Sequence, residues 1–338
     1  MRILIFNFFS GVMERGIPIY CKNLRQALEM DGHHVVELCC PVWARRLPKG
    51  AQNVLFMLYE QFLMPVLALF HSRAVYPYNT ASVLGSLHPG SLLIVHDFIP
   101  NRKGDKSKVA RYVRFTQCVH AALGRDVACV STATYRVAQK LKAFSKSRRM
   151  VLPNGFWTFR AAIKGLSFPQ GDQVLLCTGV GQNKDLRGAL DLYASFLANR
   201  RIPVALLGLA GDTAITQRWL AEHPDIDPTL IRVLPRLTDR EVVEAYMRSR
   251  WVWVHSRNEG YGRSIAEAKC CAKYTIATNI PPFRDQKDHT VQLYGDSQSF
   301  AQAVHVIEGI DRSALPPQEP AEDKLLARNL RQWLKAGL

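Results

Sequence analysis

Long hydrophobic runs are missing from this sequence of 338 residues. No stretch of 18 apolar residues is free of charge and proline, which excludes a conventional membrane-spanning helix. The segment from Met1 to Ile5 lacks the long apolar core and the cleavage site of a secretory signal peptide, so we expect a cytoplasmic protein. The eight cysteines contain no C-x-x-C pair and lie mostly in apolar runs. That pattern argues against a zinc site and favours buried thiols in a reducing compartment.

Acidic residues are scarce in the first half of the chain. The formal net charge is +16, and residues 1–160 hold 22 Lys and Arg against 8 Asp and Glu, a net charge of +14. Two clusters supply much of this excess: Arg102, Lys103, Lys106, Lys108, Arg111 and Arg114, and then Arg136, Lys140, Lys142, Lys146, Arg148 and Arg149. Charge of one sign on this scale predicts an anionic partner, such as nucleic acid, acidic lipid or a phosphorylated acceptor. The alternative is a pair of solvated helix faces, although such faces usually carry both signs.

Short apolar segments alternate with longer amphipathic ones, without the tight turns of hairpins. We expect strands at residues 3–6, 35–38, 91–96, 127–130, 150–152, 174–177, 204–207, 231–234, 251–254 and 275–277. We expect helices at residues 17–30, 186–197, 239–247, 264–270 and 322–335. This alternation predicts an α/β fold of parallel sheets with helices on both faces.

The alternation restarts after residue 170, which predicts two domains. Residues 1–160 form a first doubly wound, Rossmann-like domain, residues 161–170 form a linker, and residues 171–320 form a second Rossmann-like domain. Residues 321–338 form a C-terminal helix that we expect to pack back on the first domain. Ligands of such sheets bind at the carboxyl ends of the strands, so two facing domains would place a site in a central cleft between them.

The densest chemical signal is the segment Glu-Gly-Tyr-Gly-Arg-Ser-Ile-Ala-Glu at residues 259–267. It follows an expected strand and opens an expected helix. Gly260 and Gly262 let the backbone approach a ligand closely, and the amides and dipole of a helix start favour a phosphate. Glu259 and Glu267 have carboxylates that suit sugar hydroxyls. The alternative is a surface turn with a capping acid.

This segment resembles the Glu-x7-Glu motif of the retaining GT-B glycosyltransferases, in particular family four (GT4), which includes many bacterial transferases of polysaccharide and lipid-linked glycan synthesis. The resemblance covers nearly the whole chain. The start of the chain with Gly11 and Gly16 is similar to the family's first βα unit, and His96 stands in a similar strand end, Val-His-Asp. The segments at residues 130–132, 152–155 and 279–284 also resemble family segments, in the family's order.

The resemblance implies a role for each matching residue. Glu259 would contact hydroxyls of the donor sugar, and Glu267 would hold the ribose hydroxyls of the nucleotide. His96 would lie near the reacting sugar, although a histidine that caps a buried strand is the alternative. The remaining donor-binding residues implied by the match are Gly11, Gly16, Lys184, Gly260, Tyr261, Gly262, Arg263 and Ser264. A cation such as Lys184 suits a leaving diphosphate, because charge develops there as the glycosidic bond breaks.

One departure from the family's pattern concerns the diphosphate. Many members have an arginine just after the strand glycine, whereas here Gly179 is followed by Val180, and the spacing to Lys184 is one residue shorter. Arg263 is our hypothesis for the second positive charge. Unchanged donor affinity and turnover in the variant Arg263→Ala would contradict this hypothesis.

Two further patterns look like ligand motifs and are interpreted otherwise. Asp225 and Asp227 form a D-x-D, which binds a metal in a different transferase fold, but the flanking prolines favour a polar loop. We therefore expect no metal and no cofactor beyond the nucleotide-sugar substrate. Gly179-Val180-Gly181 follows an expected strand, but position 184 is Lys, so the dinucleotide fingerprint fails at its third glycine.

Residues 54–70 are strongly apolar, interrupted by Glu60, Gln61 and Pro65. This stretch is either a buried helix pair or part of a membrane-facing surface. Apolar area near basic clusters is what reversible docking on an anionic bilayer requires. The basic segments at residues 102–114 and 136–149 therefore predict peripheral contact with the inner face of the cytoplasmic membrane.

Together these patterns predict a metal-independent retaining transferase. The predicted donor is a nucleotide diphosphate sugar, either GDP-mannose-like or a UDP-sugar. The predicted acceptor is a lipid-linked or polysaccharide-precursor glycan, such as a precursor of lipopolysaccharide. A GT-B sugar-nucleotide epimerase is the alternative enzyme. A basic nucleic-acid-binding protein is the alternative outside enzymes, but no helix-turn-helix, zinc finger or RNA-binding aromatic motif occurs, so we expect no nucleic acid partner.

Overall fold

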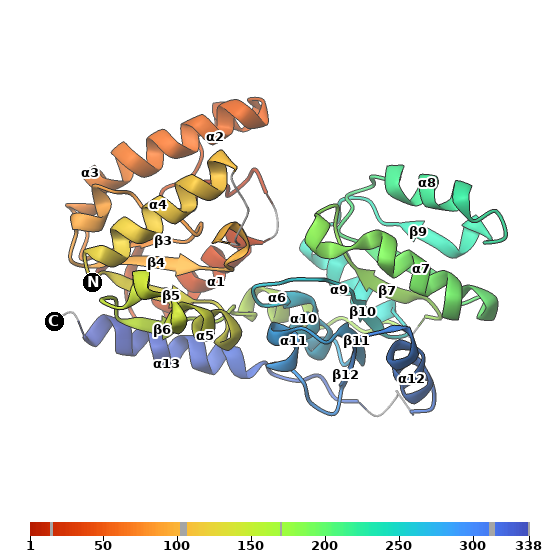
Figure 1. The fold of residues 1–338 in the computed structure, drawn as a ribbon. Coiled ribbons are helices and arrows are strands. Elements are labelled where there is room, and N and C mark those ends of the chain that lie inside the picture. The colour runs from red at the N-terminus through yellow and green to blue at the C-terminus, as the bar shows by residue number, and fades with distance from the viewer. Residues whose placement is uncertain (14–15, 102–106, 170, 311–314, 337–338) are drawn as a thin grey trace. The chain divides into compact units, whose positions relative to one another are not determined.

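A computed structural model describes residues 1–13, 16–101, 107–169, 171–310 and 315–336. It divides the chain into two compact units (Figure 1). Unit 1 is formed by Met1–Thr158 together with Ala321–Leu338, and unit 2 by Phe159–Pro320. The segment expected to be a linker, residues 161–170, begins inside helix α6 (Trp157–Ile163), which spans the boundary.

Unit 1 is built on a parallel sheet with the strand order β2-β1-β3-β4-β5-β6. The strands are β1 (Arg2–Ile5), β2 (His34–Glu37), β3 (Arg73–Tyr76), β4 (Ser91–Val95), β5 (Asp126–Cys129) and β6 (Arg149–Val151). The longer helices are α1 (Ile17–Met30), α2 (Lys49–Leu58), α3 (Met64–Ala68), α4 (Lys108–Ala122), α5 (Thr132–Lys140) and α13 (Ala321–Lys335). A π-helical turn, η2 (Tyr59–Leu63), joins α2 to α3.

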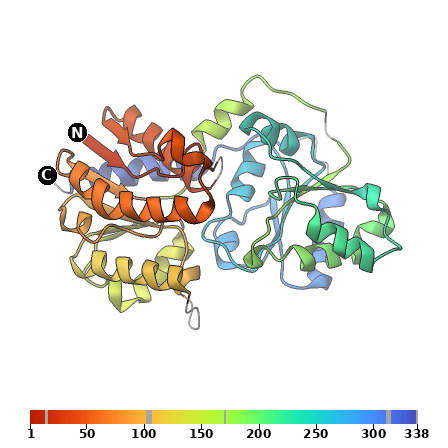
Figure 2. The ribbon, with the colours of Figure 1, turned by 90° about the horizontal axis from the view of Figure 1, so that it is seen from above.

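Both faces of the unit 1 sheet are covered. One core packs side chains of α2–α3, α4 and α5 against the sheet. The stretch α2–α3 and helix α4 run side by side in both views (Figures 1 and 2), and α1 packs with α13 on the other face. Local sequence sets the helix ends: the hydroxyls of Ser107 and Ser131 accept the Ala110 and Thr134 amides at the starts of α4 and α5, which satisfies otherwise unpaired donors.

Unit 2 repeats the architecture with the strand order β12-β11-β10-β7-β8-β9. Its strands are β7 (Val174–Cys177), β8 (Val204–Leu207), β9 (Ile231–Val233), β10 (Val252–Val254), β11 (Thr275–Thr278) and β12 (Val291–Tyr294). The helices are α7 (Leu186–Phe196), α8 (Ala214–Glu222), α9 (Asp239–Arg248), α10 (Arg263–Cys270), α11 (Pro281–Arg284) and α12 (Ser297–Glu308). This is the order of a dinucleotide-binding sheet.

The unit 2 core explains why these segments fold locally. Trp219, Trp251 and Trp253 are fully buried, together with apolar residues of α7 and α12. Two helices start with reciprocal capping: Thr238 with Glu241 in α9, and Asp296 with Ser299 in α12. Such caps satisfy orphan amides and fix where a helix begins.

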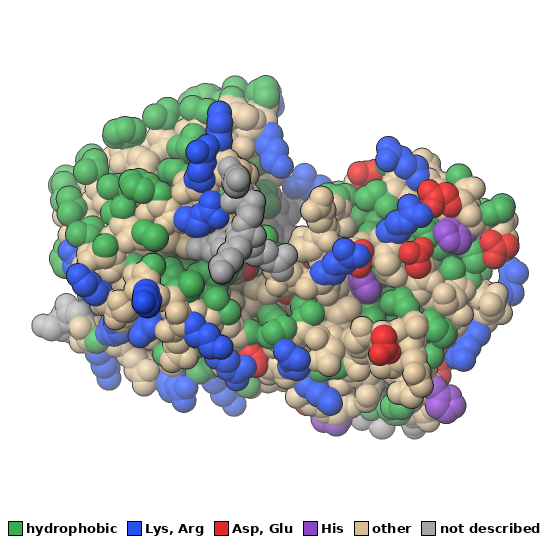
Figure 3. Space-filling model, viewed as in Figure 1, with side chains coloured by type: hydrophobic (Ala, Val, Ile, Leu, Met, Phe, Trp, Pro, Cys, Tyr) green, Lys and Arg blue, Asp and Glu red, His purple; other side chains and the backbone are tan. Residues whose placement is uncertain are grey.

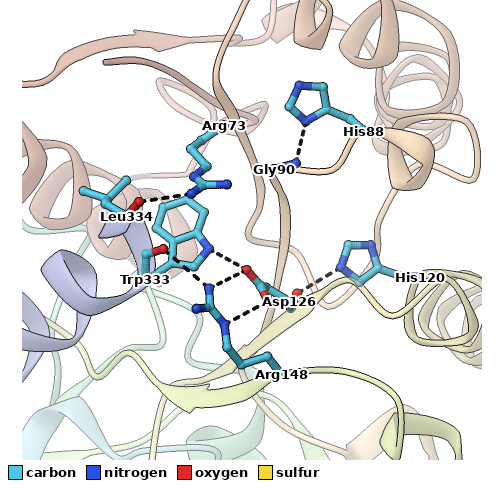
Figure 4. A network of polar contacts seen from close by, with 8 residues as sticks. All are labelled: Arg73, His88, Gly90, His120, Asp126, Arg148, Trp333 and Leu334. Carbon is cyan, nitrogen blue, oxygen red and sulfur yellow. Dashed lines mark hydrogen bonds and ion pairs between the residues drawn. The ribbon is translucent and has the colours of Figure 1, made fainter. Parts of the chain in front are cut away.

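The C-terminal helix α13 belongs to unit 1. Figure 4 shows its Trp333 beside the sheet, where the indole Nε1 donates to Asp126 Oδ2 at 2.9 Å. Arg148 donates to the same carboxylate at 2.7 Å. Arg73 lies over the Trp333 ring, 5.3 Å from its centroid, and donates to the Leu334 carbonyl at 3.1 Å. The contacts of Trp333 and Leu334, between residues more than 180 positions apart in the chain, attach α13 to the sheet of unit 1.

The α/β class and the two Rossmann-like, doubly wound sheets expected from the sequence are confirmed by the two parallel sheets. The predicted strands at 174–177 and 204–207 and the predicted helix at 17–30 have the observed bounds, and the other predicted elements differ by one residue at one or both ends. The sequence reasoning missed the strands β3 and β12 and the helices α8 and α12. For residues 54–70, a buried helix pair and a surface-facing segment were both left open. The buried helix pair is wrong, because this helical stretch buries only one of its sides.

Candidate active site

The carboxyl edge of the unit 2 sheet brings two predicted residues together. Lys184 follows β7 in the short helix η6 (Gln182–Lys184), and Glu259 follows β10. The Lys184 ammonium donates to Glu259 Oε1, which also accepts the Ser256 hydroxyl at 2.9 Å. β7 and β10 are neighbours at the point where the strand order reverses, and open α/β sheets bind ligands in the crevice at this point.

The turn between Glu259 and α10 requires glycine at one position. Gly262 has φ +84°, and a Cβ there would meet Phe283 Cε1 at 2.2 Å. Gln286 holds the turn, because its Nε2 donates to the carbonyl oxygen of Tyr261 at 2.5 Å. Helix α10 then begins at Arg263, with Ser264 as its second residue. Its positive end therefore begins four residues after Glu259 in the chain, and such a helix start stabilises an anion.

Glu267 has a different environment from Glu259. It is 1% exposed, and its Oε2 accepts the Tyr246 hydroxyl at 3.0 Å. Its Oε1 accepts Arg263 Nη2 at 3.4 Å. Burial raises the pKa of Tyr246, so this hydroxyl stays a donor. Arg263, our hypothesis for a diphosphate contact, therefore points at Glu267 in this structure.

The sequence reasoning missed His255 and Asp185, which carry no motif. His255 is buried directly after β10, and burial lowers its pKa. Its Nδ1 contacts the Tyr294 hydroxyl, and its Nε2 lies 3.4 Å from Asp185 Oδ2. Arg257 Nε donates to the same Asp185 oxygen at 2.7 Å. These side chains line a cavity of about 310 Å³ at the carboxyl edge of β10, β11 and β12.

The remaining predicted residues lie in unit 1. His96 follows β4 at the carboxyl edge of the sheet, and its ring packs edge-on against Tyr20 with centroids 5.0 Å apart. Gly16 caps α1 with φ +78°. Gly11 has φ +74°, and a Cβ there would meet the Arg45 guanidinium at 2.7 Å. These three residues belong to unit 1, whereas the lysine, the glycine turn and the two glutamates belong to unit 2.

A cavity of about 370 Å³ lies at the strand-order reversal of unit 1, between α2 and α4. Phe9, which follows β1, and Tyr78, which follows β3, line it together with Phe56 of α2 and Tyr112 of α4. The rings of Phe9 and Phe56 stack at 5.4 Å, and the Tyr78 hydroxyl accepts the Phe9 amide at 3.0 Å. The walls are therefore largely apolar, and four of the ten lining residues are aromatic.

The structure places the other charged motifs as follows. Asp227 caps a short helix, where its carboxylate accepts the Thr229 hydroxyl at 2.6 Å and pairs with Arg201. No cluster of three or more His, Cys, Asp or Glu suited to a metal ion occurs among the described residues. In the first basic cluster, positions 102–106 lie outside the described residues, while Lys108 and Arg111 are exposed on α4.

Comparison with a family model gives the decisive match in unit 2. Residues 172–307 match the model of Glycosyl transferases group 1, and this span contains Lys184, the glycine turn and both glutamates. Unit 2 carries a glycosyltransferase domain. No curated protein matches the sequence of this glycosyltransferase significantly.

Solved structures match the glycosyltransferase over almost its full length at low identity. The HepE protein of Anabaena, in complex with UDP and glucose, is 15% identical with a TM-score of 0.65, over 99% of this chain and all of the other. The catalytic domain of starch synthase IV from Arabidopsis thaliana, bound to ADP and acarbose, is 11% identical with a TM-score of 0.67, over 99% of both chains. A UDP-GlcNAc 2-epimerase from Methanocaldococcus jannaschii is 13% identical with a TM-score of 0.57, over 99% and 100%.

These likenesses establish the GT-B fold. No described helix is long and apolar enough to cross a membrane.

Proposed function

We propose that this enzyme moves a sugar from a nucleotide diphosphate donor to a lipid-linked or polysaccharide-precursor glycan, with retention of configuration and without a metal. The observation that carries the proposal is the Lys184–Glu259 contact at the strand-order reversal of unit 2. It sets a cation for phosphate and a carboxylate for sugar hydroxyls side by side, next to the start of α10. The GT4 assignment and the donor also rest on the Glu-x7-Glu motif.

Each side chain has a task in this proposal. Lys184 passes from Glu259 to the diphosphate when the donor binds, and it stabilises the charge on the leaving phosphate. Glu259, released from Lys184, accepts hydroxyls of the donor sugar. A ribose hydroxyl competes with Arg263 for Glu267 Oε1, which frees the guanidinium for phosphate. Because Tyr246 holds the other oxygen of Glu267, the carboxylate keeps its orientation through this exchange.

The transfer step follows a front-side displacement. The bond between the anomeric carbon and the phosphate oxygen breaks, and an acceptor hydroxyl oxygen forms the new bond on the same face. The hydroxyl proton passes to the leaving phosphate oxygen. The displacement requires no metal ion in this proposal, because Lys184, Arg263 and the start of α10 supply positive charge for the leaving phosphate.

The acceptor belongs to unit 1 in this proposal. The aromatic cavity between α2 and α4 lies where an open α/β sheet binds its ligand, and its walls suit a hydrocarbon chain better than a free sugar. The basic segments at residues 102–114 and 136–149 suit an acidic bilayer on the cytoplasmic side. Among their described residues, Arg136, Lys140, Lys142 and Lys146 are exposed.

A nucleotide screen tests the donor site. Thermal unfolding is followed with UDP, GDP, ADP, dTDP and CMP and with their sugars, without added metal. A nucleotide diphosphate is expected to raise the melting temperature, because it binds only the folded state, and Glu267→Ala is expected to abolish the shift. Absence of any shift, together with salt-sensitive DNA binding, would instead support the nucleic-acid alternative.

The epimerase is the second candidate, because the archaeal epimerase shares the fold along the whole chain. An epimerase interconverts free nucleotide sugar without an acceptor. Conversion of one nucleotide sugar into another by the pure protein would favour it, whereas release of free nucleotide only when a glycan acceptor is added would favour transfer.

A further inference from the structure

The helical stretch from α2 to α3 exposes an apolar face that nothing in unit 1 covers among the described residues. Six large side chains on this stretch and directly after its end at Ala68 are between 49% and 75% exposed. We call them the apolar ridge: Val54, Leu58, Phe62, Val66, Leu69 and Phe70. Figure 3 shows hydrophobic side chains gathered over this part of the molecule. Single exposed apolar residues are ordinary, but a contiguous set of this size marks an interaction surface.

The ridge results from how this stretch is wound. Val54, Leu58, Phe62 and Val66 recur every four residues, and the buried positions 52, 60, 64 and 68 follow the same spacing on the other side. In an ideal α-helix of 3.6 residues per turn, such rows would rotate by about 40° at each step. The wider turn η2 counteracts this rotation in the middle of the stretch. The exposed row therefore stays on one face.

The ridge carries no acidic side chain of its own at the surface. Glu60 is the only acidic residue between positions 38 and 96, and it is fully buried. Thr80 and Tyr112 each donate to its carboxylate at 2.5 Å. These contacts turn Glu60 inward and tie the back of the stretch to α4. The outward face is thus left to apolar side chains.

Cations border the ridge. Lys49 is exposed at the start of α2, and Lys108 and Arg111 are exposed on the neighbouring helix α4. Between and beside them, α4 exposes Val109 and Phe115. An apolar face with a cationic border is the surface that lies in the headgroup region of an anionic bilayer.

We propose that the apolar ridge enters the headgroup–acyl boundary of an anionic membrane while Lys49, Lys108 and Arg111 contact acidic headgroups. A second copy of the chain fits this surface less well. The same patch faces itself across a two-fold interface, so the cationic borders of two copies would repel each other.

The ridge also connects to the proposed acceptor site. Met57 and Val109 line the cavity between α2 and α4 and are themselves exposed beside the ridge. A membrane-seated ridge would hold the mouth of this cavity against the lipid. The link between the ridge and the acceptor cavity rests on the proposed lipid-linked acceptor. Membrane binding by the ridge itself requires no transferase activity.

Vesicle sedimentation of the full-length protein tests the proposal. Wild type is expected to bind vesicles containing about 30% phosphatidylglycerol and to bind pure phosphatidylcholine weakly. The variant Phe62→Ser/Leu69→Ser/Phe70→Ser is expected to lose at least about tenfold in affinity for the anionic vesicles. A second variant, Lys49→Gln/Lys108→Gln/Arg111→Gln, is expected to reduce both binding and its dependence on salt.

Matched controls separate the ridge from general stickiness. Met30→Ser on α1 and Val306→Ser on α12 remove apolar residues that are 69% and 44% exposed, and both are expected to bind like wild type. The ridge variant must keep the nucleotide-induced thermal shift, so that its loss of vesicle binding is distinguished from a failed donor site. Vesicle binding unchanged in the ridge variant would overturn the proposal. So would a wild-type dimer that the ridge variant converts to a monomer without any vesicle binding.

Discussion

The two units share an architecture but differ in charge. Unit 1 holds 25 Lys and Arg against 10 Asp and Glu, whereas unit 2 holds 19 against 18. In Figure 3 the visible face of unit 2 mixes red and blue side chains, and that of unit 1 carries mainly blue ones among green. Nearly the whole positive excess of the protein therefore belongs to the unit that also exposes the apolar ridge.

The two units also differ in the polarity of the residues at the point where the strand order reverses. In unit 2 the reversal between β7 and β10 holds Lys184 and Glu259, a polar pair suited to a sugar diphosphate. In unit 1 the reversal between β1 and β3 holds an aromatic cavity lined by Phe9, Phe56 and Tyr78. One architecture thus presents two chemistries at equivalent places, because function resides in the loops after the strands rather than in the sheet.

The largest expected effect concerns how unit 1 is closed by α13. Trp333→Ala removes a buried indole that donates to Asp126 and stacks under Arg73. We expect a loss of about 3–5 kcal/mol in the free energy of unfolding. Hydrogen exchange should accelerate in β3 to β5 of unit 1 and remain unchanged in β7 to β10 of unit 2.

The control for Trp333 is Arg331→Ala on the same helix. Arg331 is exposed and pairs with Asp31 at 2.7 Å, so its removal should cost less than about 1 kcal/mol. Equal acceleration of exchange in both units by Trp333→Ala would contradict the assignment of α13 to unit 1.

The next effect concerns the glycine turn of unit 2. Gly262→Ala places a Cβ in a left-handed conformation and 2.2 Å from Phe283, and we expect a loss of about 2–3 kcal/mol from strain and the contact together. Gly295→Ala is the matched control, because its Cβ would meet nothing within 4 Å. Urea unfolding measures both variants, and equal stability of the two would show that the turn tolerates a side chain.

A smaller effect is expected from pH in unit 1. Burial lowers the pKa of His120 to about 4, while an unfolded histidine has a pKa of about 6.5. As the pH falls, His120 therefore takes up its proton in the unfolded chain before it does so in the folded protein. The contribution of neutral His120 to the free energy of unfolding is complete above about pH 6.5 and is lost as the pH falls toward 4. Between pH 7 and pH 5 the loss is about 2 kcal/mol.

The variant His120→Gln isolates this pH effect. Glutamine can retain contacts with Ser86 and the Asp126 carbonyl, the two partners of the imidazole, but it cannot titrate. Urea unfolding at pH 7 and pH 5 should show a smaller pH dependence in this variant than in wild type. His34→Gln, at an exposed position, serves as the control. An undiminished pH dependence in His120→Gln would contradict the assignment.

Much of the fold could be predicted from sequence, because most strands are short apolar runs between amphipathic helices. The misses have physical reasons. β3 begins with Arg73, which is buried against Trp333 and the Leu334 carbonyl, so a charged residue interrupts the apolar pattern. β12 carries Gln292 at its second position. The fate of residues 54–70 could not be predicted, because composition does not tell which face of a helix is covered.

The candidate site was predictable in its parts but not in its contacts. The spacing of Glu259 and Glu267 marked the glycine turn, and the family resemblance added Lys184. The contact between Lys184 and Glu259 joins residues 75 positions apart, and only the order of the strands brings them together. His255 and Asp185 carry no spacing signal, because their meeting also depends on which strands are neighbours.

Calorimetric titration with nucleotide diphosphates tests the central claim most directly, namely that Lys184 at the strand-order reversal of unit 2 receives the donor diphosphate. Lys184→Ala is compared with Arg187→Ala, an exposed cation three residues further along that pairs with Glu222. The expected result is at least about tenfold weaker binding in Lys184→Ala and wild-type affinity in Arg187→Ala. Wild-type affinity in Lys184→Ala would contradict the claim.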